Sequence, residues 1–121
     1  MMAFYERHVC RVPWPDFVVR TFAGLAAAPE VYFTMNGPSE FHVIGTIKDW
    51  DISDRLGQIE APTLVFSGRY DEVTPAITEA AHRAIPGSEY VVLEESSHMA
   101  QAEEPERTLD LVRDFLGRAE R

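Results

Sequence analysis

The stretch that decides the fold is "PTLVFSGRYDEVTP", residues 62–75. Its apolar first half ends at Gly68, as is typical of a short strand buried on both faces. Thr74 can then cap a helix that has Pro75 at its first position. We expect this helix to run to about Ile85, because Pro-Gly follows it and breaks helices.

The same alternation continues downstream of this stretch. The apolar run "EYVVLEE", residues 89–95, predicts a second strand, and Pro105 predicts the start of a last helix. Strand, helix, strand and helix in this order predict a βαβ unit with a parallel sheet. Because two parallel strands do not make a stable sheet, we expect them to form one edge of a larger α/β sheet.

Residues 1–60 have a different character, with short helical segments separated by Pro and Gly. Residues 2–10 predict one helix, and Pro15 begins a second with an apolar stripe of Phe17, Val18, Phe22 and Leu25. Residues 29–37 predict a third helix. A fourth short helix is expected near residue 54, after a cap at position 51 or 53.

Composition limits the possible functions. The chain has 121 residues, a net charge of −9 and a pI of about 4.8, so nucleic acid is not an expected partner. There is one cysteine, Cys10, which allows no intramolecular disulfide and favours a reducing compartment. No apolar run is long enough for a membrane span, and the first residues do not resemble a signal peptide. We therefore expect a cytoplasmic protein without a membrane partner.

Two side chains with complementary chemistry follow the two predicted strands. Asp71 comes just after the first strand and His98 just after the second. Because catalytic groups of open α/β sheets lie beyond the carboxyl ends of the strands, we expect these side chains to meet. A carboxylate at one imidazole nitrogen would fix the tautomer of His98 and stabilise its protonated form, as in a general base.

Several motifs resemble a known superfamily. "APTLVFSGRYDEVTP" followed by "SSHMAQAEEPE" resembles the C-terminal part of α/β-hydrolases, in which acid and histidine follow a nucleophile in this order. "MNGPSEFHVIGTIKDWD" resembles the cap segment of the proline iminopeptidases, serine aminopeptidases that release an N-terminal residue, often proline, from short peptides. The resemblance implies a helical cap (lid) segment in residues 1–50. It implies that residues 51–121 are the C-terminal part of the hydrolase domain, with its last two parallel strands and their helices.

The resemblance also implies roles for four residues. Asp71 matches the triad acid and His98 the triad base, while Glu40 and Glu72 match carboxylates that hold the free α-amino group of a peptide substrate. No cofactor or metal is implied. His8 and Cys10 lie two residues apart, but no second ligand pair has suitable spacing, so a metal site is not expected.

The nucleophile of the family does not occur in this sequence. None of the six serines lies in a G-x-S-x-G motif. We therefore expect a C-terminal portion of a serine aminopeptidase that is inactive alone, and whether the chain is itself an enzyme stays open. One alternative is a non-catalytic truncated domain that self-associates or pairs with a missing N-terminal segment, as one chain of a split hydrolase. Another is different α/β-hydrolase chemistry, such as that of an esterase.

Overall fold

The computed structural model describes residues 2–120, which form two compact units. The first unit contains residues 2–14 and 53–120, and the second contains residues 15–52. Along the chain the elements are α1 (Met2–His8), α2 (Asp16–Ala27), α3 (Glu30–Met35), a 3₁₀ helix (Ser53–Gln58), β1 (Leu64–Gly68), α4 (Pro75–Ala84), β2 (Glu89–Leu93), α5 (Ala100–Glu103) and α6 (Pro105–Ala119).

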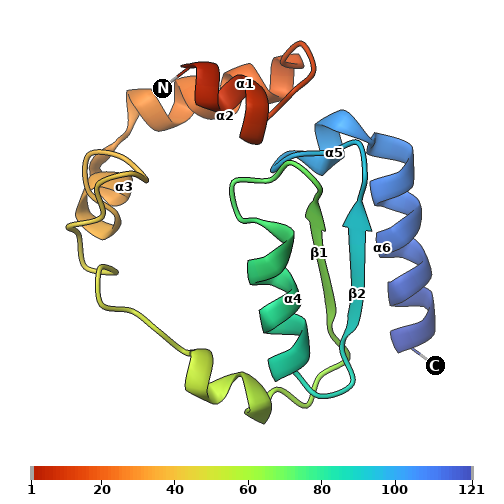
Figure 1. Cartoon of the computed structure of the whole chain (residues 1–121). Coiled ribbons are helices and arrows are strands. Elements are labelled where there is room, and N and C mark those ends of the chain that lie inside the picture. The colour runs from red at the N-terminus through yellow and green to blue at the C-terminus, as the bar shows by residue number, and fades with distance from the viewer. Residues whose placement is uncertain (1, 121) are drawn as a thin grey trace. The chain divides into compact units, whose positions relative to one another are not determined.

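The first unit is built on a two-stranded parallel sheet. β1 pairs with β2 from Leu64 opposite Glu89 to Gly68 opposite Leu93. In Figure 1, α4 lies beside β1 and α6 beside β2. The predicted βαβ unit and the last helix are therefore confirmed. Parallel pairing brings the carboxyl ends of both strands to the same edge of the sheet, where the loops that follow them meet.

The sheet is buried mainly at this carboxyl end. Ser67 and Gly68 of β1 are buried and Leu93 of β2 is completely buried, whereas Leu64 to Phe66 are only half-buried. The expectation of a strand buried on both faces is therefore wrong for the first part of β1. The carboxyl end is better covered because the loops after both strands fold over it.

Three local features differ from the predictions. The helix near residue 54 is a 3₁₀ helix, and α5 forms between the second strand and Pro105, where no helix is predicted. Thr74 occupies the N-cap position of α4, but its side chain makes no capping hydrogen bond. Pro75, which follows it, has no N–H, so the first turn of α4 has one unpaired amide fewer to satisfy.

The second unit holds α2, α3 and the loop that follows α3. Val18 is the buried residue of the predicted stripe on α2, whereas Phe17 and Leu25 are exposed. The loop returns along α3, where the amides of Ile44 and Gly45 donate to the carbonyl oxygen of Asn36. Gly45 is required at this approach, because a Cβ there would lie 2.2 Å from the carbonyl oxygen of Met35.

The two units divide the chain differently from the predicted boundary after residue 50. The second unit ends close to that boundary, at Ile52, but it begins at Pro15. Residues 2–14 belong with the sheet, because α1 and the segment after it bond to the loops at its carboxyl end. The assignment of residues 1–50 to a cap and of residues 51–121 to the hydrolase domain stays a prediction. Among residues 2–120, no helix is long and apolar enough to cross a membrane.

Candidate active site

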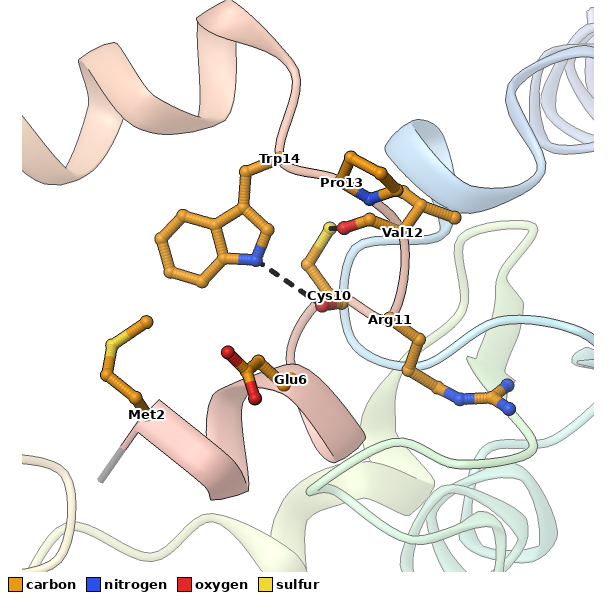
Figure 2. Close-up of a pocket in the computed structure, with 7 residues that line it drawn as sticks. All are labelled: Met2, Glu6, Cys10, Arg11, Val12, Pro13 and Trp14. Carbon is orange, nitrogen blue, oxygen red and sulfur yellow. Dashed lines mark hydrogen bonds between the residues drawn. The ribbon is translucent and has the colours of Figure 1, made fainter.

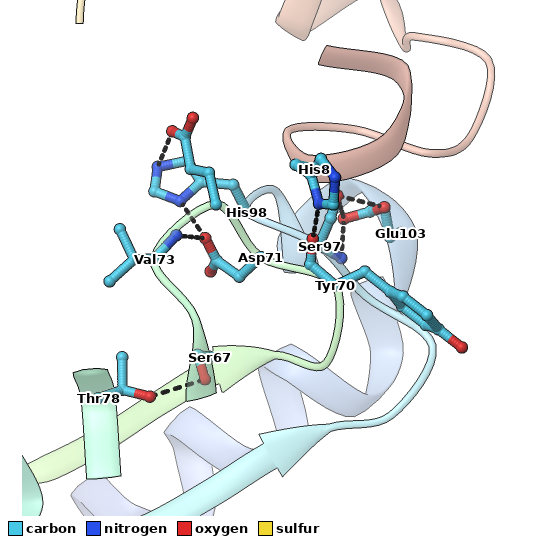
Figure 3. Close-up of polar contacts among 10 residues, drawn as sticks. His8, Ser67, Tyr70, Asp71, Val73, Thr78, Ser97, His98 and Glu103 are labelled. Atoms are coloured by element: carbon cyan, nitrogen blue, oxygen red, sulfur yellow. Dashed lines mark hydrogen bonds and ion pairs between the residues drawn. The ribbon is translucent and has the colours of Figure 1, made fainter. Parts of the chain in front are cut away.

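The carboxyl end of the sheet brings Asp71 and His98 together. The Nδ1–H of His98 donates to Oδ1 of Asp71 across 2.9 Å, as Figure 3 shows. The Asp71 side chain is only 8% exposed, whereas that of His98 is 45% exposed. The expectation that these side chains meet is confirmed. Their geometry is that of a histidine held at Nδ1 by a sheltered carboxylate.

A local turn holds the Asp71 carboxylate in place. The backbone N–H of Val73 donates to the same Oδ1 across 2.8 Å, and the N–H of Asp71 donates to the carbonyl oxygen of Gly68. Such an Asx turn is common after a strand and needs no function of its own. Here one oxygen both closes the turn and accepts the imidazole proton, so the turn geometry sets the position of His98.

The pKa of His98 is raised above its ordinary value. The hydrogen bond to Asp71 is the largest cause, and the negative charges of Asp71, Glu72 and Glu103 act in the same direction. Burial opposes them, because it disfavours the charged form. The site therefore stabilises the imidazolium, which is what a general base needs after it has taken a proton.

Glu72 is the second acid of the predicted pair. Its Oε1 lies 3.9 Å from Nε2 of His98, and its side chain is 23% exposed. Its backbone N–H donates to the carbonyl oxygen of His8. The structure therefore places Glu72 on the side of His98 opposite to Asp71, next to the nitrogen that would exchange protons with a substrate.

Glu40 belongs to the second unit. Its Oε2 accepts a hydrogen bond from the hydroxyl of Tyr32 across 3.2 Å, and that hydroxyl accepts one from Asn36. This short network fixes the carboxylate on the loop after α3. Its joint action with Glu72 on a substrate amine stays a prediction.

The first residues of the chain contribute contacts that sequence reasoning missed. The carbonyl oxygen of His8 accepts hydrogen bonds from the backbone amides of both Glu72 and His98, each across 3.2 Å. The carbonyl of Val9 accepts one from Met99, and Nδ1–H of His8 donates to the carbonyl of Tyr70. These contacts join the loop after β1, which carries Asp71 and Glu72 (the acid loop), to the loop after β2, which carries His98 (the histidine loop). No sequence signal could have found them, because every residue type carries the backbone carbonyls involved.

His8 and Cys10 make contacts of other kinds. Within residues 2–120, no group of three or more His, Cys, Asp or Glu side chains is placed to hold a metal ion. His8 instead donates to a backbone carbonyl, and Cys10 is buried with its sulfur near the carbonyl of Val12.

A pocket of about 510 Å³ lies beside the same N-terminal segment, and Figure 2 shows it. Trp14 borders it, with its indole N–H donating to the carbonyl of Cys10. Its lining residues all come from positions 2–14, so neither Asp71 nor His98 contributes to it. The pocket is therefore separate from the acid–histidine pair.

The buried serines of the first unit are all engaged in other contacts. Ser67 shares a hydrogen bond with Thr78, while Ser96 donates to Glu104 and Ser97 to Glu103. A serine whose hydroxyl proton is bound to a carboxylate is not activated by His98. These contacts agree with the sequence context, in which none of the three lies in a nucleophile motif.

The chain is similar to known proteins along nearly its whole length. No family model matches the chain. The proline iminopeptidase of Saccharolobus solfataricus is 44% identical over 114 residues, which are 93% of this chain and 36% of that protein. The crystal structure of a proline iminopeptidase from Mycobacterium smegmatis matches 98% of this chain and 40% of its own, with 43% identity and a TM-score of 0.91. The crystal structure of VinJ gives the same coverage and TM-score, with 49% identity.

The matches cover a much larger share of this chain than of its relatives. The chain is covered almost completely, but it spans little more than a third of the length of the curated relatives. The two strands and their helices agree with the last part of a hydrolase sheet. This chain is therefore similar along nearly its whole length to the C-terminal part of the proline iminopeptidases, and its fold is that of the C-terminal portion of an α/β-hydrolase.

Proposed function

We propose that this chain supplies the general base, its orienting acid and the amine-binding carboxylates of a serine aminopeptidase that releases N-terminal proline from short peptides. The observation that carries the proposal is the 2.9 Å hydrogen bond from His98 to the sheltered carboxylate of Asp71, at the end of two neighbouring parallel strands. The similarity to proline iminopeptidases supports the substrate class.

The proposed reaction uses Nε2, the ring nitrogen of His98 that is not bonded to Asp71. Nε2 takes the proton of a serine hydroxyl while the serine oxygen bonds to the carbonyl carbon of the first peptide bond. The imidazolium then gives this proton to the departing amine nitrogen as the C–N bond breaks. A water molecule next loses a proton to Nε2 as its oxygen bonds to the acyl carbon. The bond from this carbon to the serine oxygen then breaks, Nε2 returns the proton to that oxygen, and the amino acid leaves. Asp71 keeps Nδ1 protonated throughout.

Glu72 would recognise the free amino group of the substrate. An aminopeptidase must hold a cationic amine at a fixed distance from the carbonyl that reacts, and a carboxylate provides a charge-assisted anchor for it. The proximity of its partly sheltered carboxylate to Nε2 of His98 supports this role. Glu40 would be the second carboxylate for the same amine.

The nucleophilic serine would come from a segment outside these 121 residues. The six serines lack the nucleophile motif, and the relatives extend well beyond the matched region. We therefore expect the isolated chain to hydrolyse neither proline amides nor simple esters above background. Turnover that survives rigorous purification and disappears in His98→Ala would contradict this, because one of these serines would then be the nucleophile. The cytoplasmic location stays a prediction.

A chimera tests the proposed function. In it, this chain replaces the matching 114 residues of the Saccharolobus protein, so that the remaining segment supplies its own nucleophile. Hydrolysis of a proline anilide is expected, with kcat falling about 10⁴-fold or more in His98→Ala, because triad members act as a unit. Glu72→Gln should mainly raise KM for substrates with a free amine. An N-acetylated proline substrate carries no ammonium group, so the unchanged chimera and Glu72→Gln should hydrolyse it equally slowly.

The control is Glu106→Gln, which removes one negative charge from the exposed first turn of α6. It should leave both kinetic constants unchanged. A folded chimera without activity toward proline anilides would overturn the proposal and favour the non-catalytic alternative.

A further inference from the structure

One carboxylate, that of Glu103, holds the residue that precedes His98 in its loop. Ser97, the residue before His98, is completely buried. Its backbone N–H donates to Oε2 of Glu103 across 2.8 Å, and its hydroxyl donates to Oε1 of the same carboxylate, also across 2.8 Å. Figure 3 shows these two contacts beside the bond from His98 to Asp71. Glu103 therefore fixes both the backbone and the side chain of the residue adjacent to the base.

The same carboxylate also holds the N-terminal segment. Oε1 of Glu103 accepts a hydrogen bond from the backbone N–H of Arg11 across 2.8 Å. In the same segment, the carbonyl oxygen of His8 accepts hydrogen bonds from the backbone amides of Glu72 and His98. Glu103 thus links the histidine loop to the N-terminal segment. That segment in turn joins the histidine loop to the acid loop.

The contacts need a carboxylate and not merely a side chain of the right shape. The backbone donors of Arg11 and Ser97 point at different oxygens of Glu103, and a backbone N–H cannot turn around to accept. A glutamine could present its oxygen to only one of them, and its NH₂ group would face the other donor. Glu103→Gln therefore loses one of these two bonds and sets its NH₂ group against either the exposed N–H of Arg11 or the part-buried N–H of Ser97.

A neighbouring pair of residues repeats the arrangement. Glu104 accepts from the hydroxyl of Ser96 across 2.6 Å and from the backbone N–H of Glu95 across 3.1 Å. Ser96 is also completely buried. Two successive carboxylates at the junction of α5 and α6 thus hold the loop on which His98 lies. Glu103 holds the residue closer to the imidazole and is the one that also reaches the N-terminal segment.

We propose that Glu103 is a positioning residue for His98: its carboxylate holds Ser97 and Arg11 so that Nδ1 of the imidazole stays on Asp71 and Nε2 stays directed toward the substrate. Glu103 touches neither substrate nor nucleophile in this scheme. The inference rests on the proposed function for its effect on catalysis, whereas its effect on the geometry of His98 can be measured in this chain alone.

The first test uses the 121-residue chain and proton NMR. The proton on Nδ1 of His98, bonded to Asp71, should give a downfield signal protected from exchange. We expect this signal in the unchanged chain and in the control Glu106→Gln, and its loss or broadening in Glu103→Gln. Ser97→Ala keeps the charge of Glu103 but removes one donor, so it should weaken the signal without abolishing it. An unchanged signal in folded Glu103→Gln would overturn the proposal.

The second test uses the chimera described above. Glu103→Gln should lower kcat for the proline anilide about ten- to a hundredfold with KM within about twofold, because a small misplacement of a catalytic group acts on the chemical step. Glu103→Asp should restore little activity, since its shorter side chain cannot reach both donors. Loss of stability with unchanged kcat would show that Glu103 is only structural.

The two tests separate the two proposals. If the chimera is inactive, the proposed function fails, and the NMR signal still decides the role of Glu103. If Glu103→Gln does not fold, Ser97→Ala decides. An unchanged downfield signal together with unchanged kcat in Ser97→Ala would then overturn the positioning role.

Discussion

At the scale of single residues, Asp71 connects local structure with chemistry. Its Oδ1 closes a turn through Val73 and accepts the Nδ1 proton of His98, so the same atom serves the fold and the site. This double use explains why an ordinary turn residue can also be a sheltered carboxylate with a fixed direction. Its sheltered position strengthens the bond to His98, because little water competes for it.

Asp71→Asn should lower the pKa of His98. The hydrogen bond to the Asp71 carboxylate is the main cause of the raised pKa, and an uncharged amide removes both this charge-assisted bond and the charge. The measurement is a proton NMR titration of the His98 ring. Asp54→Asn, which removes a charge from the exposed 3₁₀ helix, is the control and should leave this pKa in place. Equal pKa values in the unchanged chain and Asp71→Asn would contradict the assignment.

Stability should depend on pH through the same pair. The pKa of His98 is higher in the folded than in the unfolded chain, so the folded state binds this proton more tightly. The resulting stabilisation is fully present below the unfolded pKa of about 6.5 and is lost as pH rises through the folded pKa. Urea unfolding at a series of pH values should therefore show a decline across this window that is smaller in Asp71→Asn. Parallel curves for the two proteins would exclude the link.

At the scale of elements, β1 ends where the histidine loop crosses it. A Cβ on Gly68 would lie 2.3 Å from the carbonyl oxygens of both Ser96 and Ser97. These are backbone atoms of the loop that carries His98, so they cannot move aside as a flexible side chain would. The last residue of the strand is therefore a glycine because of the close approach, not because of a turn conformation.

Alanine at two glycines should have opposite effects. Gly68→Ala should lower the free energy of unfolding by about 1–3 kcal/mol or more, since it forces the loop away from the strand. Gly117→Ala should raise it by up to about 1 kcal/mol, because a Cβ there meets nothing within 4 Å and alanine favours helix. Urea unfolding measures both. A Gly68→Ala variant as stable as the unchanged chain would show that the loop is not packed on β1 as described.

At the scale of the whole molecule, the sheet is small for its fold class. Within residues 2–120, β1 and β2 pair only with each other, so each has an outer edge without a strand beside it. Several apolar side chains of the same unit are also exposed, namely Tyr70, Val73, Ile77, Leu109 and Leu116. Unpaired strand edges and exposed apolar surface both favour association with another chain.

We therefore expect the isolated chain to associate in solution, either with itself or with a segment that supplies further strands. Sedimentation velocity over a range of concentrations should show species larger than 13.7 kDa. Ile77→Glu on α4 and Leu116→Glu on α6 test whether helix faces carry the contact, since either change should then reduce association. If both leave association unchanged, the strand edges or the helices of residues 15–50 carry it. A cooperatively folding monomer at all concentrations would contradict the expectation.

The sequence by itself determined the elements and the central pair of the site. Apolar runs with proline and glycine at their ends are local signals, and they placed β1, α4, β2 and the start of α6. The meeting of Asp71 and His98 then followed from a general rule about the carboxyl ends of parallel strands. Both conclusions depend on neighbours in the chain or on one simple pairing, so one sequence is enough to reach them.

Only the tertiary structure decided what holds that pair in place. The bond from Arg11 to Glu103 joins residues 92 positions apart, and the carbonyl of His8 binds amides of two loops that no pattern connects with it. Such contacts depend on where distant backbone atoms meet after packing, and backbone N–H and C=O groups are the same in every residue. For this reason the acid and the histidine could be predicted from residue types, whereas the role of α1 and Glu103 could not.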